Sequence, residues 1–113
     1  MIKDIKTTQD WEQLLAESHE KPTFLLKHST RCGISAAAWR AFQACTGTGE
    51  CGFWRVLVVE DRPMSQQIAR DSGVQHQSPQ AILFHQGIPV WNASHYSITA
   101  DGLSAALSAA GSD

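Results

Sequence analysis

Apolar residues in this chain recur at two spacings, and each spacing predicts one kind of element. Four segments carry apolar side chains three or four positions apart, which is typical of amphipathic helices. Four short runs are continuously apolar or rich in β-branched and aromatic residues, which favours buried strands. The helical positions are Trp11, Leu14 and Leu15; Ile34, Ala38, Ala41, Phe42 and Cys45; Met64, Ile68 and Ala69; and Leu103, Ala106, Leu107 and Ala110. The strand-like runs are residues 23–26, 53–60, 80–85 and 88–91.

Local signals place the ends of several elements. Thr7 or Thr8 can cap the first helix, because a hydroxyl there accepts a bond from a free backbone N–H. Pro63 stands where the third helix is expected to begin, and Gly73 stands where it is expected to end. Thr99 can cap the last helix in the same way as the first.

The predicted order of elements is α-β-α-β-α-β-β-α. Gln86-Gly87 joins the last two strands in a tight turn, which predicts an antiparallel hairpin. The earlier strands alternate with helices, which implies parallel pairing through right-handed crossovers. We therefore expect an α/β protein of the thioredoxin-like fold, with a four-stranded mixed sheet flanked by helices. Since no linker or repeat divides the chain, residues 1–113 are expected to form one domain.

Cys32 follows the first predicted strand and directly precedes the second predicted helix. Free N–H groups in the first turn of a helix, together with the helix dipole, favour a negative charge there. These effects lower the pKa of a thiol from about 8.5 into the reactive range. Lys27, His28 and Arg31 belong to a predicted polar loop, residues 27–31, and add positive potential near the sulfur. The competing interpretation, an inert buried cysteine, fits these polar neighbours badly.

Ser35 completes a Cys-x-x-Ser motif with Cys32. It occupies the place where dithiol redox enzymes carry their second cysteine. A hydroxyl can hydrogen-bond a thiolate but cannot form a disulfide with it. The motif therefore predicts monothiol chemistry, with Cys32 as the nucleophile and Ser35 beside it in the catalytic site.

The other cysteines are expected to have different roles. The chain has three cysteines, and an odd number argues against a disulfide framework. Cys45 lies on the apolar face of the second predicted helix, about 20 Å along the helix from Cys32, which is too far for a resolving thiol. Cys51 remains a candidate resolving thiol. No pair of Cys or His residues has the spacing of a zinc site, so no metal is expected.

Ser78-Pro79 directly precedes the predicted strand 80–85. On its own, a proline at this position simply starts a strand. In a thioredoxin-like fold the position holds a cis-proline beside the reactive cysteine, and the backbone of Ser78 then offers an edge to a bound thiol or peptide. We therefore expect a cis peptide bond here and a substrate-binding role for Ser78 and Pro79.

Composition and charge narrow the classes of partner. The net charge is −2 and the basic residues are scattered, so the chain lacks the electrostatic footprint of a nucleic-acid-binding protein. The apolar runs are far too short to cross a membrane. Residues 1–6 contain no apolar stretch that could act as a secretion signal. We therefore expect a cytoplasmic protein, whose thiols stay reduced.

Five stretches form a specific combination from the first predicted helix to the last. They are Phe24-Leu25-Leu26-Lys27-His28-Ser29-Thr30, Cys32-x-Ile34-Ser35, Arg62-Pro63-x-Ser65, His76-Gln77-Ser78-Pro79-Gln80-Ala81-Ile82-Leu83 and Val90-Trp91-x-Ala93-Ser94-His95-x-x-Ile98-Thr99. This combination resembles the YtxJ-like monothiol bacilliredoxins.

The resemblance implies a bacterial protein that removes bacillithiol, a thiol made of cysteine, glucosamine and malate, from mixed disulfides on other proteins. Bacillithiol is then a co-substrate, with no tightly bound cofactor, and bacillithiolated proteins are partners of a monomer or weak homodimer. Lys27 or Arg31 is expected to help bind malate, and His28 is expected near the sulfur. Ser94 and His95, which follow the last predicted strand, are expected to contact the bound thiol. The remaining histidines, expected at surface or strand-end positions, are His19, His76 and His85.

One departure from the family pattern keeps two other functions open. The family usually has Thr-Cys-Pro-Ile-Ser, whereas Gly33 stands in place of the proline here and brings the motif close to the Cys-Gly-Phe-Ser of cluster-carrying monothiol glutaredoxins. An iron–sulfur carrier bridged through Cys32 is one alternative. Against it, the chain has Asn92-Ala93-Ser94-His95 where those proteins have Gly-Gly-x-Asp. The other alternative is a non-enzymatic thioredoxin-like binding or stress protein with an unreactive Cys32.

Overall fold

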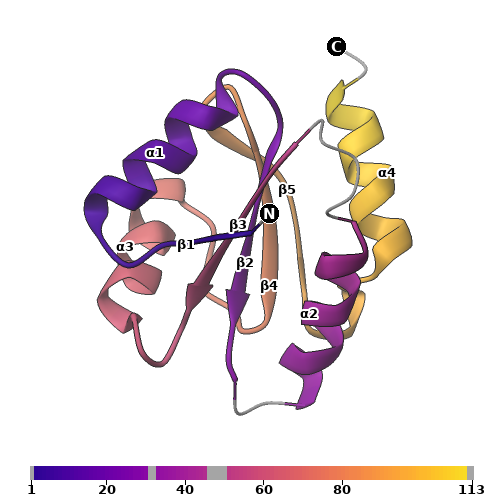
Figure 1. Ribbon diagram of the computed structural model, residues 1–113, viewed down its shortest axis with the longest axis horizontal. Coiled ribbons are helices and arrows are strands. Elements are labelled where there is room, and N and C mark those ends of the chain that lie inside the picture. The colour runs from indigo at the N-terminus through magenta and orange to yellow at the C-terminus, as the bar shows by residue number, and fades with distance from the viewer. Residues whose placement is uncertain (1, 31–32, 46–50, 112–113) are drawn as a thin grey trace.

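A computed structural model describes residues 2–30, 33–45 and 51–111 of the chain (Figure 1). Helices and strands alternate over most of this length. In chain order the elements are β1 (Lys3–Asp4), α1 (Thr8–Ser18), β2 (Thr23–His28), α2 (Gly33–Ala44), β3 (Gly52–Leu57), α3 (Arg62–Ser72), β4 (Gln80–His85), β5 (Ile88–Ser94), a short 3-10 helix η1 (His95–Ser97) and α4 (Ala100–Gly111).

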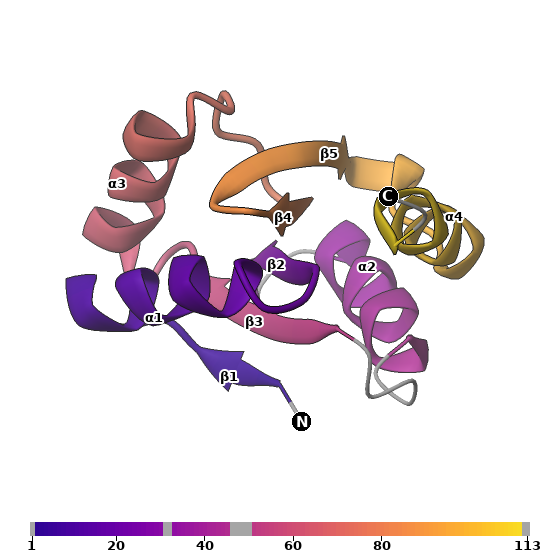
Figure 2. The same cartoon turned by 90° about the horizontal axis from the view of Figure 1, so that it is seen from above.

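The strands form one mixed sheet in the order β1-β3-β2-β4-β5. β2 is parallel to β3 on one side and antiparallel to β4 on the other. Helices α1 and α3 cover one face of the sheet, and α2 and α4 cover the other (Figure 2). Each face has its own apolar core, and adjacent residues of β2 alternate between them: Phe24 and Leu26 pack toward α2 and α4, whereas Leu25 packs toward α1 and α3. The predicted α/β thioredoxin-like fold is confirmed.

The sheet has five strands rather than the predicted four, because β1 pairs in parallel with β3. Its two residues, Lys3 and Asp4, are both exposed and polar, so they carry no alternating apolar pattern. The strand is held by backbone pairing and by Arg55 of β3, whose guanidinium donates to both carboxylate oxygens of Asp4 at 2.7 and 3.2 Å. Such a short edge strand is set by its tertiary partner and not by its own sequence.

Three strand ends differ from the prediction. β2 continues through Lys27 and His28, which were expected in a loop. β3 ends at Leu57 instead of residue 60, and β5 extends to Ser94 instead of residue 91. The polar side chains of Lys27 and His28 gave no strand pattern in the sequence. Backbone pairing of β2 with both β3 and β4 nevertheless continues as far as Lys27.

Local signals placed the turns and caps well. Thr7 caps α1 in a capping box with Asp10, whose pKa is lowered mainly by the backbone N–H of Lys6. Gln86 and Gly87 both have positive φ, at 59° and 80°, as a two-residue hairpin turn of the I′ type requires. The predicted turn between β4 and β5 is therefore confirmed.

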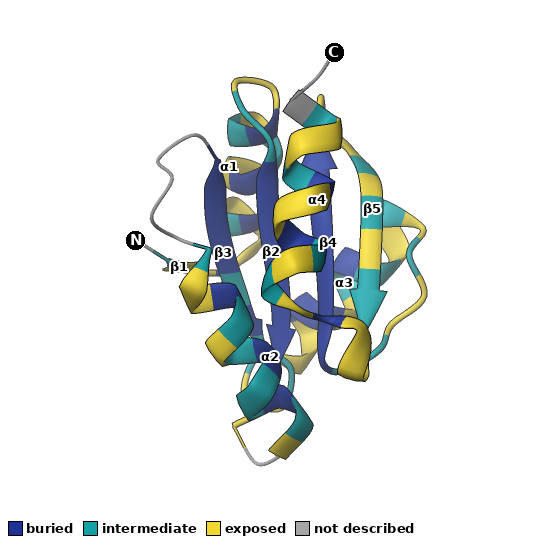
Figure 3. Ribbon diagram, turned by 90° about the vertical axis from the view of Figure 1, so that its right-hand side faces the viewer, coloured by how far each residue is buried: buried dark blue, intermediate teal, exposed yellow. Residues whose placement is uncertain are grey.

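The outer edge of the sheet is β5, which is exposed along much of its length (Figure 3). Ile88 and Val90 are large apolar residues at its surface. Between them stands Pro89, and the pairing of β5 with β4 shifts register between Leu83 and Phe84. Among the helices of the described residues, none is both long and apolar enough to cross a lipid bilayer.

Gly73 and Gly33 form a matched pair for testing one of these caps. Gly73 ends α3 with φ of 75°, a left-handed conformation that is costly for any residue with a Cβ. We expect Gly73→Ala to lower the free energy of unfolding by about 1 kcal/mol. A Cβ at either glycine meets no atom within 4 Å, so Gly33→Ala, in a right-handed helix, should leave stability unchanged or higher. Urea denaturation of the two variants measures the difference, and equal losses would contradict the argument.

Candidate functional site

Several predicted site residues come together at one end of the sheet, where β2 and β5 end and β4 begins. β5 runs antiparallel to β4, so Ser94 at its end lies opposite Gln80 at the start of β4. Lys27, near the end of β2, pairs with the same Gln80. Helix α2 follows β2 in the chain and begins at this end of the sheet (Figure 1). The predicted nucleophile Cys32 and the predicted cation Arg31 fall between β2 and α2 in the sequence and lie outside the described residues.

Ser35 lies in the first turn of α2 and is fully buried. Its hydroxyl oxygen accepts a hydrogen bond from the backbone N–H of Ser29, at 3.3 Å. This contact ties the start of the β2–α2 loop, directly after β2, to the first turn of the helix. A serine hydroxyl that accepts one bond still has its own proton to donate. Ser35 can therefore hold the loop in place and hydrogen-bond a second group.

His28 ends β2 and faces the α2 side of the sheet. Its ring lies 5.3 Å from the ring of Trp39, centroid to centroid, and only a small part of the side chain is exposed. Burial lowers the pKa of His28, and Arg55 acts in the same direction, against smaller opposing effects from the Ser35 backbone and Glu60. The ring is therefore neutral near pH 7. Its Nδ1 is buried without a hydrogen-bond partner among the described residues.

The peptide bond between Ser78 and Pro79 is cis, as expected. The carbonyl of Pro79 accepts a hydrogen bond from the backbone N–H of His95 at 3.0 Å, so the loop before β4 and the end of β5 are joined directly. His95 has φ of 54°, an uncommon conformation for a residue with a side chain. Ser94, which was expected after the last strand, is its final residue, and His95 begins η1.

A polar cavity of about 410 Å³ borders this junction on the α3 side. Its lining is dominated by uncharged hydrogen-bonding side chains. The lining residues are Gly73, Val74, Gln75, Gln77, Gln80, Asn92 and Ser94. Gln80 donates from Nε2 to the carbonyl of Gln75 at 3.0 Å, while its buried Oε1 has no partner within the described part of the chain. Unpartnered buried amide oxygens are uncommon, and a hydroxyl or N–H of a ligand can satisfy one.

Lys27 occupies a different position from the one predicted. Because it lies in β2 and not in a loop, its side chain points away from His28, into the layer between the sheet and α3, where it is fully buried. Its ammonium donates to the carbonyl of Ser65 at 3.3 Å and contacts Nδ1 of His76 at 3.1 Å. Burial lowers the pKa of Lys27 from 10.5 to about 8. The lysine therefore remains mostly protonated at pH 7.

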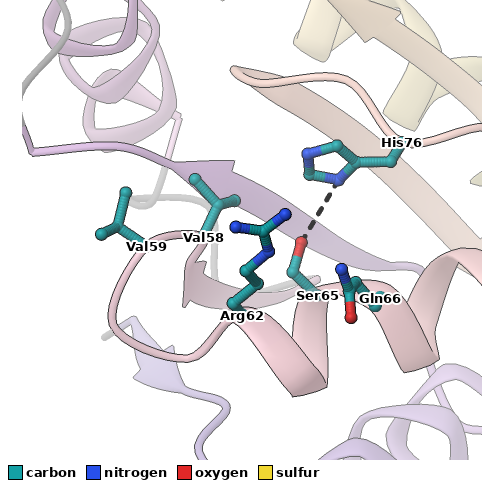
Figure 4. Close-up of a pocket in the computed structure, with 6 residues that line it drawn as sticks. All are labelled: Val58, Val59, Arg62, Ser65, Gln66 and His76. Carbon is teal, nitrogen blue, oxygen red and sulfur yellow. Dashed lines mark hydrogen bonds between the residues drawn. The ribbon is translucent and has the colours of Figure 1, made fainter.

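His76 is exposed, as expected, yet its ring also contacts two buried groups. Nδ1 lies 3.1 Å from the ammonium of Lys27. It also lies 3.3 Å from the hydroxyl of Ser65, a hydrogen bond drawn in Figure 4. Burial lowers the pKa of His76, and the charges of Lys27 and Arg62 lower it further. No sequence pattern predicts this cluster, because Lys27 and His76 are 49 positions apart and neither falls in an apolar pattern.

The two described cysteines are consistent with packing roles. Cys45 packs against the core on the α2 and α4 side, and its sulfur lies 3.6 Å from the carbonyl of Ala100. Cys51, the predicted candidate for a resolving thiol, is buried in the same core. A group of three or more His, Cys, Asp or Glu side chains able to hold a metal ion does not occur among the described residues.

Comparison with known proteins agrees with this architecture. Residues 3–103 match the family described as Monothiol bacilliredoxin BrxC. A solved structure of a provisionally assigned oxidoreductase with a thioredoxin fold is 33% identical, with a TM-score of 0.84 over 93% of this chain and 92% of that chain.

Structures of thioredoxins are similar at lower identity. Thioredoxin from Malassezia sympodialis (Mala s 13) is 17% identical, with a TM-score of 0.79 over 99% of this chain and 92% of its own. Thioredoxin f from spinach chloroplast is 16% identical, with a TM-score of 0.77 over 98% and 94%. At these identities the likeness concerns the fold alone.

Burial of Lys27 makes a prediction about the pH dependence of stability. Between pH 8 and 10.5 the unfolded chain binds more protons at this amine than the folded chain, so the wild type gains stability as pH rises through this range. Lys27→Met lacks the amine and should match or exceed the wild type at pH 7. Its advantage should shrink by about 2 kcal/mol between pH 7 and pH 10 in urea denaturation. Lys6→Met, at an exposed lysine, is the control, and parallel pH profiles for wild type and Lys27→Met would contradict the prediction.

Proposed function

Because the chain belongs to the monothiol bacilliredoxin (BrxC) family and is a monothiol thiol–disulfide oxidoreductase, we propose that it removes bacillithiol from mixed disulfides on cytoplasmic proteins. The match to the family over residues 3–103 is the observation that carries the proposal. Bacillithiol is the co-substrate, and the bacillithiolated proteins are the partners. Residues 1–113 act as one domain, as a monomer or weak homodimer.

The proposed reaction is a thiol–disulfide exchange at Cys32. The Cys32 thiolate attacks the bacillithiol sulfur of the mixed disulfide and forms a new S–S bond as the old one breaks. The protein sulfur leaves as a thiolate and takes up a proton from solvent. Cys32 then carries bacillithiol, and a second small thiol attacks this adduct, releases an oxidised small-molecule disulfide and restores the Cys32 thiolate. The number of disulfides is conserved in each step.

The residues at this end of the sheet have separate proposed roles. Ser35, with a hydroxyl proton to donate from the first turn of α2, stabilises the Cys32 thiolate. His28, a neutral ring whose Nδ1 has no partner among the described residues, offers the sulfur a second hydrogen bond. Arg31 adds positive charge beside the thiolate. Buried Lys27 contributes positive potential from beneath the site instead of through surface contact.

The substrate is proposed to bind at the cis-proline loop before β4. The backbone of Ser78, before Pro79, pairs with the bound thiol. Ser94 and His95 lie against the same loop, since the N–H of His95 bonds to the carbonyl of Pro79. This hydrogen bond supports the proposal, because it makes the two loops one binding surface.

The proposal predicts which cysteine carries the adduct. A model protein with a single bacillithiolated cysteine, incubated with the wild type, should lose bacillithiol while Cys32 gains it, as measured by intact mass and peptide mapping. Cys32→Ala should lose the activity entirely. Cys45→Ala and Cys51→Ala are matched controls with packing roles and should keep most of it. Transfer by Cys32→Ala at the wild-type rate would sink the proposal.

Ser35 provides a test of the one-thiol mechanism. Ser35→Cys places a second thiol in the first turn of α2, where it can attack the Cys32 adduct and release bacillithiol as an internal disulfide forms. The variant should therefore accumulate the internal disulfide in place of the bacillithiol adduct. Ser35→Ala should still accumulate the adduct, at a rate reduced about tenfold, because it loses the hydrogen bond to the thiolate together with the one from the Ser29 N–H but leaves the Cys32 nucleophile in place. Accumulated adduct in Ser35→Cys would contradict the proposed position of this side chain.

A further inference from the structure

Lys27 is a buried cation that has no carboxylate partner within residues 2–30, 33–45 and 51–111. Among the described residues the ion pairs are Lys3 with Glu17 and Arg55 with Asp4, and neither involves Lys27. The two groups within hydrogen-bond distance of its ammonium, the carbonyl of Ser65 and the imidazole of His76, carry no negative charge. Buried charges in proteins are normally paired. The positive charge inside this layer is therefore uncompensated by the described residues.

A cavity of about 230 Å³ lies on the outer side of this cluster (Figure 4). It is formed where β3 leads into α3 and where the chain approaches β4. The lining residues are Val58, Val59, Arg62, Ser65, Gln66 and His76. The lining contains one full positive charge, one imidazole and no carboxylate. Glu60 and Asp61 precede Arg62 in the chain but do not line the cavity.

The hydrogen bonds determine which ring nitrogen of His76 carries the proton. The Lys27 ammonium can only donate, so Nδ1 of His76 accepts from it. This assignment places the ring proton on Nε2 in the neutral imidazole. Figure 4 shows the Arg62 guanidinium, the Ser65 hydroxyl and the His76 ring, all of which line the cavity. The charged guanidinium and the neutral imidazole thus both present N–H donors to the same small space, and the ammonium of Lys27 lies behind the His76 ring.

We propose that this cavity is a binding site for the carboxylate group of a small organic acid. The Arg62 guanidinium donates a forked pair of hydrogen bonds to the carboxylate, and Nε2–H of His76 donates a third. The bound anion supplies the negatively charged partner that the Lys27 ammonium does not find among the described residues. Val58 and Val59 form an apolar wall for the carbon chain of the acid, which distinguishes this site from a pocket for inorganic phosphate.

The site goes beyond the proposed thiol exchange, and it is testable without any thiol. Succinate is the probe, and succinamide, which has the same shape without the charge, is the control ligand. In a ¹H–¹⁵N NMR titration, succinate should shift the amide signals of Val59, Arg62 and His76 in a saturable way, and succinamide should not. Arg62→Gln should weaken succinate binding about tenfold or more. Arg70→Gln removes an exposed arginine from the same helix but outside the cavity, and it should leave the affinity unchanged.

The Lys27→Met variant distinguishes two interpretations of Lys27. In one, its charge helps to bind a ligand; in the other, its two neutral hydrogen-bond partners are all that it needs. Succinate should raise the melting temperature of the wild type, because a ligand that binds only the folded state stabilises it. This shift should be absent in Lys27→Met. No saturable NMR shift with succinate, an equal effect of succinamide, or equal weakening by Arg70→Gln would overturn the site. Tighter binding of inorganic phosphate than of succinate would overturn its assignment to an organic acid.

The carboxylate can come from a free acid or from the low-molecular-weight thiol itself. Titration with reduced bacillithiol distinguishes the two sources. Shifts at Val59, Arg62 and His76 that disappear in Arg62→Gln assign the site to an acid group of the thiol, and this arm rests on the proposed function. Succinate binding without such shifts assigns the site to a separate acid, so failure of the thiol chemistry leaves the carboxylate site intact.

Discussion

The central strand β2 is the constraint on which the rest of the structure depends. It is hydrogen-bonded to β3 on one side and to β4 on the other, and all six of its residues are buried. Each side chain must therefore be accommodated by one of the two cores, whatever its polarity. The end of this strand also sets where the following loop begins, and so where Ser35 and the start of α2 lie relative to the cis-proline loop.

This constraint explains why two adjacent polar residues have such different surroundings. Strand geometry sends Lys27 toward α3 and His28 toward α2, so one strand end supplies polar groups to both faces of the sheet. His28 lies against Trp39 on the α2 side, and one of its ring nitrogens has no partner in the part of the chain that the structure describes. Lys27 reaches His76, which is separated from the cis-proline by only two positions in the chain. The polar groups of the two faces thus flank one end of the sheet.

Features that depend on neighbouring residues could be predicted from the sequence. The Thr7 cap, the Gln86-Gly87 turn and the order of the helices follow from short patterns, and the thioredoxin-like architecture follows from their order. Expectations failed where partners come from far along the chain. Polar side chains suggested a loop at Lys27, but pairing with two neighbouring strands outweighs the cost of burying an amine. The contact between His76 and Lys27 could not be predicted from the sequence, since it exists only once α3 and β4 are placed.

The exposed edge strand β5 has a consequence for self-association. A free strand edge with Ile88 and Val90 at its surface is a template on which a second chain can pair and begin an ordered aggregate. Pro89 deprives this edge of one backbone donor, and the register shift against β4 distorts its hydrogen-bonding ladder. At the other edge, β1 is only two residues long and polar. Both margins of the sheet thus carry features that disfavour backbone pairing with a second chain.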